Sequence, residues 1–179
     1  MSRCDITRLK TVSSMWAHAG FRPGQRRTAG EKLDYDAVLK TWAWRLGRQL
    51  MLAGGVFNGI YEKRKTYEFQ QVAARGQTHV VYIQCPEIKR PEIITMLAQY
   101  GLLATFISSA RPLKPHEFSS GHIHARALRY MIKMYLACLW LTWREAAGLS
   151  LEPPYIIGRA DDTGHVHTSF YKPGELVDR

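Results

Sequence analysis

The stretch that decides the fold is residues 78–108, THVVYIQCPEIKRPEIITMLAQYGLLATFIS. It starts with a β-branched and aromatic run of strand length over residues 78–84. Pro91 suits the first turn of a helix that Gly101 ends, and residues 102–108 have the composition of a second strand. A strand, a helix and a second strand form a parallel crossover unit, so the sequence predicts a mixed α/β fold.

Downstream, the pattern predicts an extended segment at residues 111–115 and a long amphipathic helix over residues 122–147, closed by Gly148. Two strands at residues 155–158 and 166–171 are expected to pair as a hairpin. The helix carries an apolar surface that is interpreted as core, with a protein-binding face as the alternative: Tyr130, Met131, Met134, Tyr135, Cys138, Trp140 and Trp143.

Upstream, apolar residues four apart predict a helix that Asp34 or Asp36 caps and Gly54 ends. Trp44 lies off its apolar stripe, where it could stack on a base, although inward packing is the commoner outcome. A second helix is predicted over residues 61–75. The stripe expected to be buried consists of Val38, Trp42, Leu46 and Leu50, with Leu39, Ala43 and Met51 beside it.

The sequence predicts three parts along the chain. Residues 1–32 show no sustained period and are interpreted as a basic arm that tracks phosphates, with a disordered tail as an equal alternative. Residues 33–76 form a basic helical extension. Residues 77–179 form the α/β core, a small sheet packed with helices.

Positive charge is concentrated in the first part of the chain. The whole sequence has 25 Lys and Arg against 15 Asp and Glu, but residues 1–76 have 14 against 6 and residues 77–179 have 11 against 9. This asymmetry favours DNA or another nucleic acid, with a solubilising surface and an anionic membrane as alternatives. The expected nucleic-acid-binding residues are Arg22, Arg26, Arg27, Arg45, Arg48, Lys63, Arg64 and Lys65.

The cysteines and the apolar runs indicate a cytoplasmic protein. Cys4, Cys85 and Cys138 are odd in number and widely spaced, which argues against a disulfide framework or a cysteine zinc site. The first residues contain no apolar signal region. Residues 131–143 form the most apolar run, which includes a lysine and falls short of the ~20 residues that a membrane span needs.

A candidate phosphate site opens the long helix at Gly121-His122-Ile123-His124. A glycine turn before a helix leaves backbone N–H groups available at the positive end of the helix dipole. The predicted phosphate-binding residues are Gly121, His122, Arg126 and Arg129.

Catalysis at that turn would be phosphodiester or nucleotide hydrolysis, because imidazole can transfer protons at neutral pH and arginine can stabilise charge. Glu87 and Arg90 follow the first strand and would face the same sheet edge, although an ordinary surface ion pair is the alternative. The predicted catalytic set is His122, His124, Arg126, Glu87 and Arg90.

The same pattern recurs as Gly164-His165-Val166-His167. These two histidines could bind a metal together with Asp161, Asp162 or His116, but the spacing matches no standard signature. Surface histidines beside a turn are the favoured interpretation, so no metal site is assigned from these residues.

Residues 79–141 resemble the core of the ParB/sulfiredoxin superfamily, in which a strand ends in a proline-rich turn with an arginine. A helix and a second strand follow, and a G-x-x-R-x-x-A motif opens the next helix. The matching residues here are Tyr82 to Pro86, Lys89-Arg90, Glu92 to Leu103, and Gly121-x-x-His124-x-x-Ala127. His124 replaces the arginine of the family motif. The cysteine of sulfiredoxins is absent from this turn, so sulfinic-acid reduction is not implied.

With its basic N-terminal helices, the whole chain is similar to the plasmid fertility-inhibition proteins of the oncogenic-suppression (Osa) type. This resemblance implies a DNA-binding protein, with DNase and nucleotide-hydrolase activities that would use ATP or another nucleotide and a divalent metal such as Mg. A protein of a DNA-transfer apparatus is the implied partner. The alternatives are a non-catalytic module that regulates such an apparatus and a helical adaptor.

Overall fold

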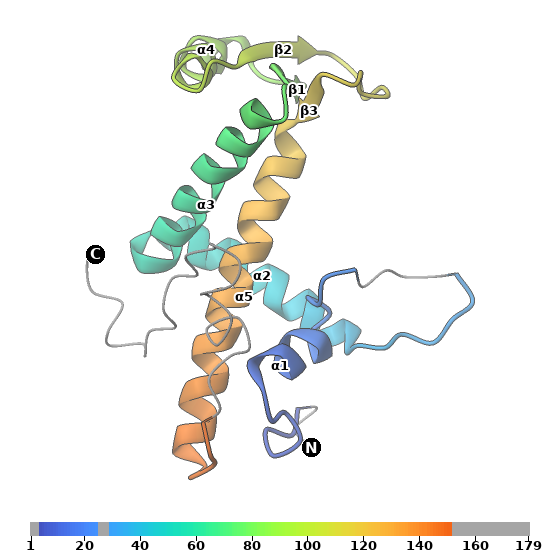
Figure 1. The fold of residues 1–179 in the computed structure, drawn as a ribbon, viewed down its shortest axis with the longest axis vertical. Coiled ribbons are helices and arrows are strands. Elements are labelled where there is room, and N and C mark those ends of the chain that lie inside the picture. Colours follow the sequence, from blue (N-terminus) through green and yellow to red (C-terminus); the bar gives the residue numbers. More distant parts are fainter. Residues whose placement is uncertain (1–3, 25–28, 152–179) are drawn as a thin grey trace. The chain divides into compact units, whose positions relative to one another are not determined.

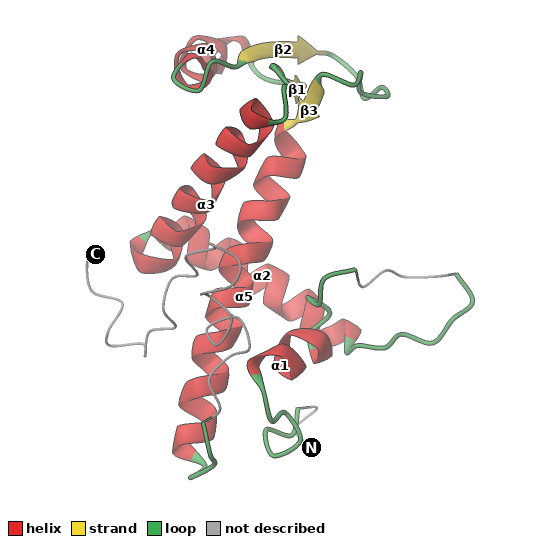
Figure 2. Ribbon diagram, in the orientation of Figure 1, coloured by secondary structure: helices red, strands yellow, loops and turns green. Residues whose placement is uncertain are grey.

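The computed structural model describes residues 4–24 and 29–151. Across these residues it contains five α-helices and a three-stranded parallel sheet, which confirms the mixed α/β class (Figures 1 and 2). The chain divides into two compact units, residues 59–130 and residues 1–58 with 131–179. We call residues 59–130 the sheet unit and the other the helical unit. This division cuts across the three parts expected from the sequence.

The predicted crossover forms the centre of the sheet unit. β1 (His79–Ile83) is followed by the short 3₁₀ turn η1 (Glu87–Lys89) and by α4 (Arg90–Ala98), and β2 (Leu103–Ile107) then pairs with β1 in parallel. The proline in the first turn of α4 begins the helix as expected, since a proline there lacks only an N–H that has no helical partner. Gly101, at φ 67°, turns the chain into β2.

A third strand, β3 (Glu117–Ser119), was not predicted, because three residues are too few to show alternation. It pairs in parallel with the other side of β1, so the strand order is β2-β1-β3. All three strands therefore point the same way and their carboxyl ends lie at one edge of the sheet. The segment between β2 and β3 has no helix, in agreement with the extended conformation predicted for residues 111–115.

Two long helices complete the sheet unit. α3 (Gly55–Ala74) enters it from the helical unit, and α5 (Ser120–Ala146) leaves it after β3; within the unit they run side by side below the sheet (Figure 1). α3 confirms the predicted second helix and starts six residues earlier than expected. Its side chains join those of β1, α4 and α5 in one core: Phe69, Val72, Val80, Leu97, Leu102 and Ile123.

The first described residues of the helical unit are folded and packed, so the disordered-tail alternative is wrong for residues 6–21. α1 (Val12–His18) begins at a capping box in which Thr11 and Ser14 bond reciprocally. Seven residues are too few to give a clear helical period, which explains why the sequence concealed this helix. Its segment is anchored by buried apolar side chains: Ile6, Leu9, Val12, Met15, Trp16 and Phe21.

The second half of α5 forms the core of the helical unit, as its apolar surface predicted. Trp140 is fully buried and its Nε1 donates to the Leu9 carbonyl oxygen at 2.7 Å. Trp16 Nε1 donates in the same way to the Lys133 carbonyl oxygen at 2.9 Å. The two tryptophans therefore bind residues 9–16 to α5 through packing of their rings and through one hydrogen bond each.

α2 (Ala37–Ala53) is capped by Asp36 and ends at Gly54 as predicted, but the expected apolar stripe is only partly its packed face. Val38 and Trp42 are 54% and 48% exposed, whereas Ala43 and Gly47 are buried. A Cβ at Gly47 would overlap Ile132 Cγ1 and would lie 2.7 Å from its Cδ1. Small residues form the packed face because the backbone of α2 approaches α5 closely there.

Trp44 is half-buried and packs against Phe21, with the ring centroids 5.8 Å apart. The predicted hairpin at residues 155–171 lies outside the described residues.

Candidate functional site

The turn predicted at Gly121 is absent, because β3 runs directly into α5. Gly121 is the second residue of that helix, and a Cβ placed there would meet only Ser119 Oγ, at 3.4 Å. The glycine is therefore not required by the backbone, which corrects the expectation of a glycine turn. What remains of the prediction is the beginning of a helix at the carboxyl edge of a parallel sheet, where anions commonly bind.

Three of the predicted phosphate-binding residues share one face of α5. His122, Arg126 and Arg129 are spaced i, i+4 and i+7, and residues at this spacing lie above one another on a helix. The first two are exposed and Arg129 is half-buried, where burial lowers the pKa of its guanidinium. We call these three residues the α5 cationic stripe.

Arg126 is held by a buried acid on α3 that the sequence analysis did not single out. Glu68 has only 4% of its side chain exposed; its Oε2 accepts from Arg126 Nη1 at 3.2 Å. Its Oε1 accepts from Arg64 Nε at 2.9 Å and from Arg64 Nη2 at 2.6 Å. Two arginines thus share one carboxylate, so the cluster keeps a net positive charge while the buried acid is fully paired.

Aromatic rings position the same arginines. The Arg126 guanidinium carbon lies 5.1 Å from the centroid of the Phe118 ring, and that of Arg64 lies 4.6 Å from the Tyr67 centroid and 4.8 Å from that of Tyr130. His122 packs edge-on against Phe118, with centroids 6.1 Å apart. These contacts restrict the arginine rotamers, although nearly half of the Arg126 side chain stays exposed (46%).

His124 is not part of the stripe. His124 follows His122 by two residues, so its side chain points to another side of the helix. The Nδ1 atom of His124 lies 2.8 Å from the Tyr61 hydroxyl. Tyr61 is buried, and burial together with nearby Glu62 raises its pKa to about 12, so its hydroxyl stays protonated. The two histidines predicted to act at one turn are therefore directed apart.

Glu87 and Arg90 lie at the carboxyl edge, as expected from parallel strands. They form an i, i+3 ion pair at 3.4 Å in which the Glu87 side chain is 88% exposed, which matches the surface-pair alternative. Arg90 also lies over the Phe106 ring at 5.2 Å, and its buried Nε has no hydrogen-bond partner among the described residues. Arg90 is thus the member of this pair with unused donor capacity.

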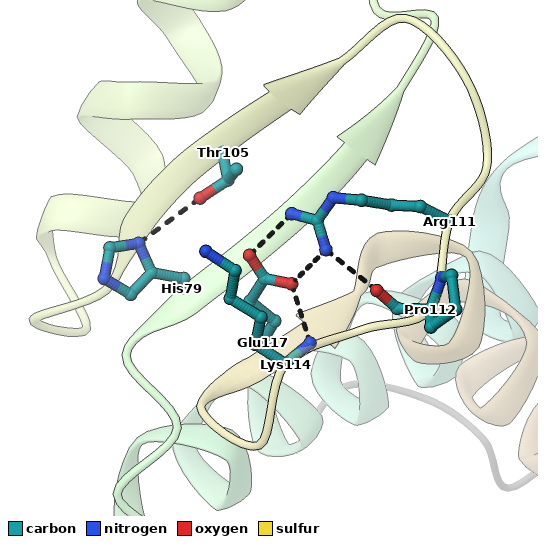
Figure 3. Close-up of polar contacts among 6 residues, drawn as sticks. All are labelled: His79, Thr105, Arg111, Pro112, Lys114 and Glu117. Carbon is teal, nitrogen blue, oxygen red and sulfur yellow. Dashed lines mark hydrogen bonds and ion pairs between the residues drawn. The ribbon is translucent and has the colours of Figure 1, made fainter.

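A second ionic cluster, which the sequence did not reveal, lies on the sheet face shown in Figure 3. Arg111 reaches from the loop before β3 and donates to both oxygens of Glu117, at 2.6 and 2.7 Å. These bonds, and a third from the Lys114 backbone N–H at 2.9 Å, lower the pKa of Glu117 to about 2. His79 Nδ1 lies 3.3 Å from Thr105 Oγ1 on the same face. The Arg111 bridge fixes the loop that returns the chain to the sheet.

The predicted nucleic-acid-binding residues are distributed over both units. Arg45 and Arg48 are exposed on α2, and Arg22 pairs with Asp34 at 2.9 Å, all in the helical unit. Lys63 is exposed on α3 in the sheet unit, where Arg64 binds Glu68 and Lys65 lies 3.6 Å from Glu62. Arg26 and Arg27 lie outside the described residues.

Within residues 4–24 and 29–151, no group of three His, Cys, Asp or Glu side chains could hold a metal ion. Asp161, Asp162, His165 and His167 fall outside that part of the chain. The same described residues contain no helix that combines the length and the apolar character needed to cross a membrane.

Comparison with known protein families, curated proteins and solved structures finds no match to this chain. The ParB/sulfiredoxin resemblance and the functions that it implies therefore stay predictions.

Proposed function

We propose that this chain is a DNA-binding protein that holds a backbone phosphate on the α5 cationic stripe. The observation that supports this function best is the alignment of His122, Arg126 and Arg129 on one helix face that starts at the carboxyl edge of a parallel sheet. A phosphate there would receive charge-assisted hydrogen bonds from Arg126 and would lie near the positive end of the helix dipole. Arg90 lies at the same sheet edge and adds a second cationic donor.

The aromatic contacts support a defined phosphate-binding site rather than a surface that only attracts anions. Phe118 contacts both His122 and Arg126 and limits the number of rotamers that either side chain samples. A pre-positioned arginine loses less conformational entropy on binding phosphate than a mobile one. Lys63, exposed on α3, extends the positive surface of the sheet unit.

The experiment is a titration of a fluorescently labelled DNA duplex, read by anisotropy, over a range of KCl concentrations. Arg126→Gln and Arg129→Gln remove charge from the stripe, and Arg75→Gln removes the same charge from an exposed position at the end of α3. Each lost phosphate contact should reduce the slope of log affinity against log salt by about 0.9. If the stripe variants bind no more weakly than Arg75→Gln, the proposed site is wrong.

Hydrolysis of a phosphodiester or a nucleoside triphosphate is the second candidate, favoured by one observation. His122 is exposed and lies one helical turn before Arg126. In this reaction the imidazole accepts a proton from the attacking water while Arg126 stabilises the negative charge that develops on the phosphate oxygens. ATP with Mg²⁺ would be the substrate implied by the family resemblance.

The matched variants for hydrolysis are His122→Ala and His124→Ala. Supercoiled plasmid and ATP are each incubated with the protein, with and without Mg²⁺. Loss of turnover in His122→Ala but not in His124→Ala supports the hydrolase, because only His122 shares the stripe. DNA binding without turnover in the wild-type protein instead supports the module that regulates a DNA-transfer or fertility-inhibition apparatus by binding alone.

A further inference from the structure

We infer that two copies of this chain pair through the outer edge of β2 and form one continuous six-stranded sheet. β2 is an edge strand in the order β2-β1-β3, and among the described residues no strand pairs with its outer side. Its five residues, LATFI, include no charge, no proline and no glycine. Natural proteins usually protect such an edge, because its unpaired backbone groups can bind another strand.

The backbone hydrogen bonds show which groups face outward. Leu103 N donates to the Thr78 carbonyl oxygen at 2.7 Å, and Gln84 N donates to the Ile107 carbonyl oxygen at 2.9 Å. The odd-numbered residues of β2 therefore direct their backbone groups toward β1. Since these groups alternate along a strand, Ala104 and Phe106 direct their N–H and C=O groups to the outer edge.

A second copy fits this edge in one antiparallel register, with the two-fold axis at Thr105. Ala104 then exchanges two hydrogen bonds with the partner's Phe106, and Phe106 exchanges two with the partner's Ala104. All outward backbone groups of these two residues are satisfied. No other centre in this strand satisfies both residues at once.

The side chains are also self-complementary in that register. The small Ala104 lies opposite the partner's large Phe106 on the covered face, and Leu103 lies opposite the partner's Ile107 on the other face. Leu103 is 58% exposed in the single chain, and Ile83, which lies beside Ile107, is 43% exposed on the same face. Pairing would cover apolar surface that parallel sheets seldom leave open to water.

The assembly closes at two copies. The opposite edge of the sheet is β3, which has three residues, too few to offer a comparable strand surface. A two-fold interface that uses the same strand in both copies leaves no second β2 edge for further growth.

The register is tested by disulfide trapping in the full-length chain. Across the axis, Thr105 faces the partner's Thr105 in a pair without hydrogen bonds, where Cα atoms approach closely enough for a disulfide. Thr105→Cys should therefore form a covalent dimer under mild oxidation, located by mass spectrometry of the cross-linked peptide. Leu103→Cys is the matched control and should not form a covalent dimer, because the residue opposite it is the partner's Ile107. Equal trapping of both variants, or of neither, would overturn the inference.

The interface itself is tested by light scattering and sedimentation over protein concentration. Wild-type protein should reach twice the mass of the chain as its concentration rises. Ala104→Pro removes one outward N–H and no bond to β1, and should remain a monomer with an unchanged circular dichroism spectrum. Dimerisation should strengthen with added salt, because each copy carries a net charge of +10. A wild-type monomer at all concentrations, or a dimer that salt weakens, contradicts the pairing; if Ala104→Pro fails to fold, the cysteine pair still decides.

Discussion

The two units use arginine beside an aromatic ring in opposite ways. In the helical unit, Arg144 is 5% exposed, lies over Trp140, and donates to the carbonyl oxygens of Ile6, Leu9 and Ser150. In the sheet unit, Arg126 lies over Phe118 at a similar distance but has 46% of its side chain exposed and binds one carboxylate. Burial thus separates an arginine that holds the fold from one that could receive a ligand.

The largest expected effect tests this contrast directly. Arg144→Met should lower the free energy of unfolding by about 2–4 kcal/mol, because it leaves buried carbonyl oxygens without donors. Arg126→Met should cost about 1 kcal/mol or less, since Glu68 keeps Arg64 as a partner. Urea denaturation followed by circular dichroism measures both. Equal losses would show that exposure does not separate the two roles.

The second largest effect compares a helical glycine in each unit, which should respond differently to substitution by alanine. Gly47→Ala should destabilise the helical unit by about 1–3 kcal/mol, because the added methyl group overlaps Ile132. Gly59→Ala is the control, since nothing lies within 4 Å of its Cβ position in the sheet unit. Alanine there should stabilise the protein by about 0.5–1 kcal/mol through helix propensity. Thermal unfolding measures the change in melting temperature for both variants. Changes of the same sign would refute the close approach of α2 to α5.

Acid should affect the sheet unit through Glu117. The pKa of this carboxyl is about 2 in the folded chain, below its ordinary value of 4.5, because Arg111 and the Lys114 N–H bind the charged form. Its contribution to stability is therefore present above about pH 4.5 and is lost as the pH falls toward 2. Urea midpoints of wild type and Glu117→Gln should differ by a constant amount at neutral pH and converge on acidification. A gap that is independent of pH would contradict the Arg111 bridge.

The smallest effect concerns the acid that pairs with Arg126. Glu68→Gln should strengthen DNA binding about two- to fivefold, since an ion pair whose arginine is partly exposed contributes about 0.5–1 kcal/mol. Glu62→Gln changes the charge of the same helix by the same amount without contacting Arg126. DNA anisotropy at fixed salt should therefore show a larger gain for Glu68→Gln. Identical gains would mean that only net charge matters and that Arg126 has no special role.

Local signals predicted those parts of the fold that have a clear period and clear ends. The crossover from β1 through α4 to β2 was predicted because Pro91 and Gly101 mark the ends of its helix. α1 and β3 were missed because each is too short to show a period. The predicted stripe of α2 included the buried Ala43 but missed Gly47, which packs closely against Ile132, and it wrongly included the exposed Val38 and Trp42.

The candidate site was predicted only where it lies on one helix. His122, Arg126 and Arg129 align through the helical repeat alone, which spacing along the chain already contains. Glu68 could be suspected from its i, i+4 spacing to Arg64, but its bond to Arg126 joins residues 58 positions apart. His122 and His124 were both candidates because they were expected to flank a turn; since both lie on α5, they point to different sides of the helix.

The sequence by itself determined the α/β class, the crossover, the caps of α2 and the basic character of the chain, because these depend on composition and on contacts between near neighbours. Only the tertiary structure decided that β3 joins the sheet, that residues 6–21 pack on α5, and that Glu68 binds Arg126. These features depend on which segments bury their apolar surfaces against one another. Such contacts join residues that are distant in sequence, so no local sequence pattern predicts them.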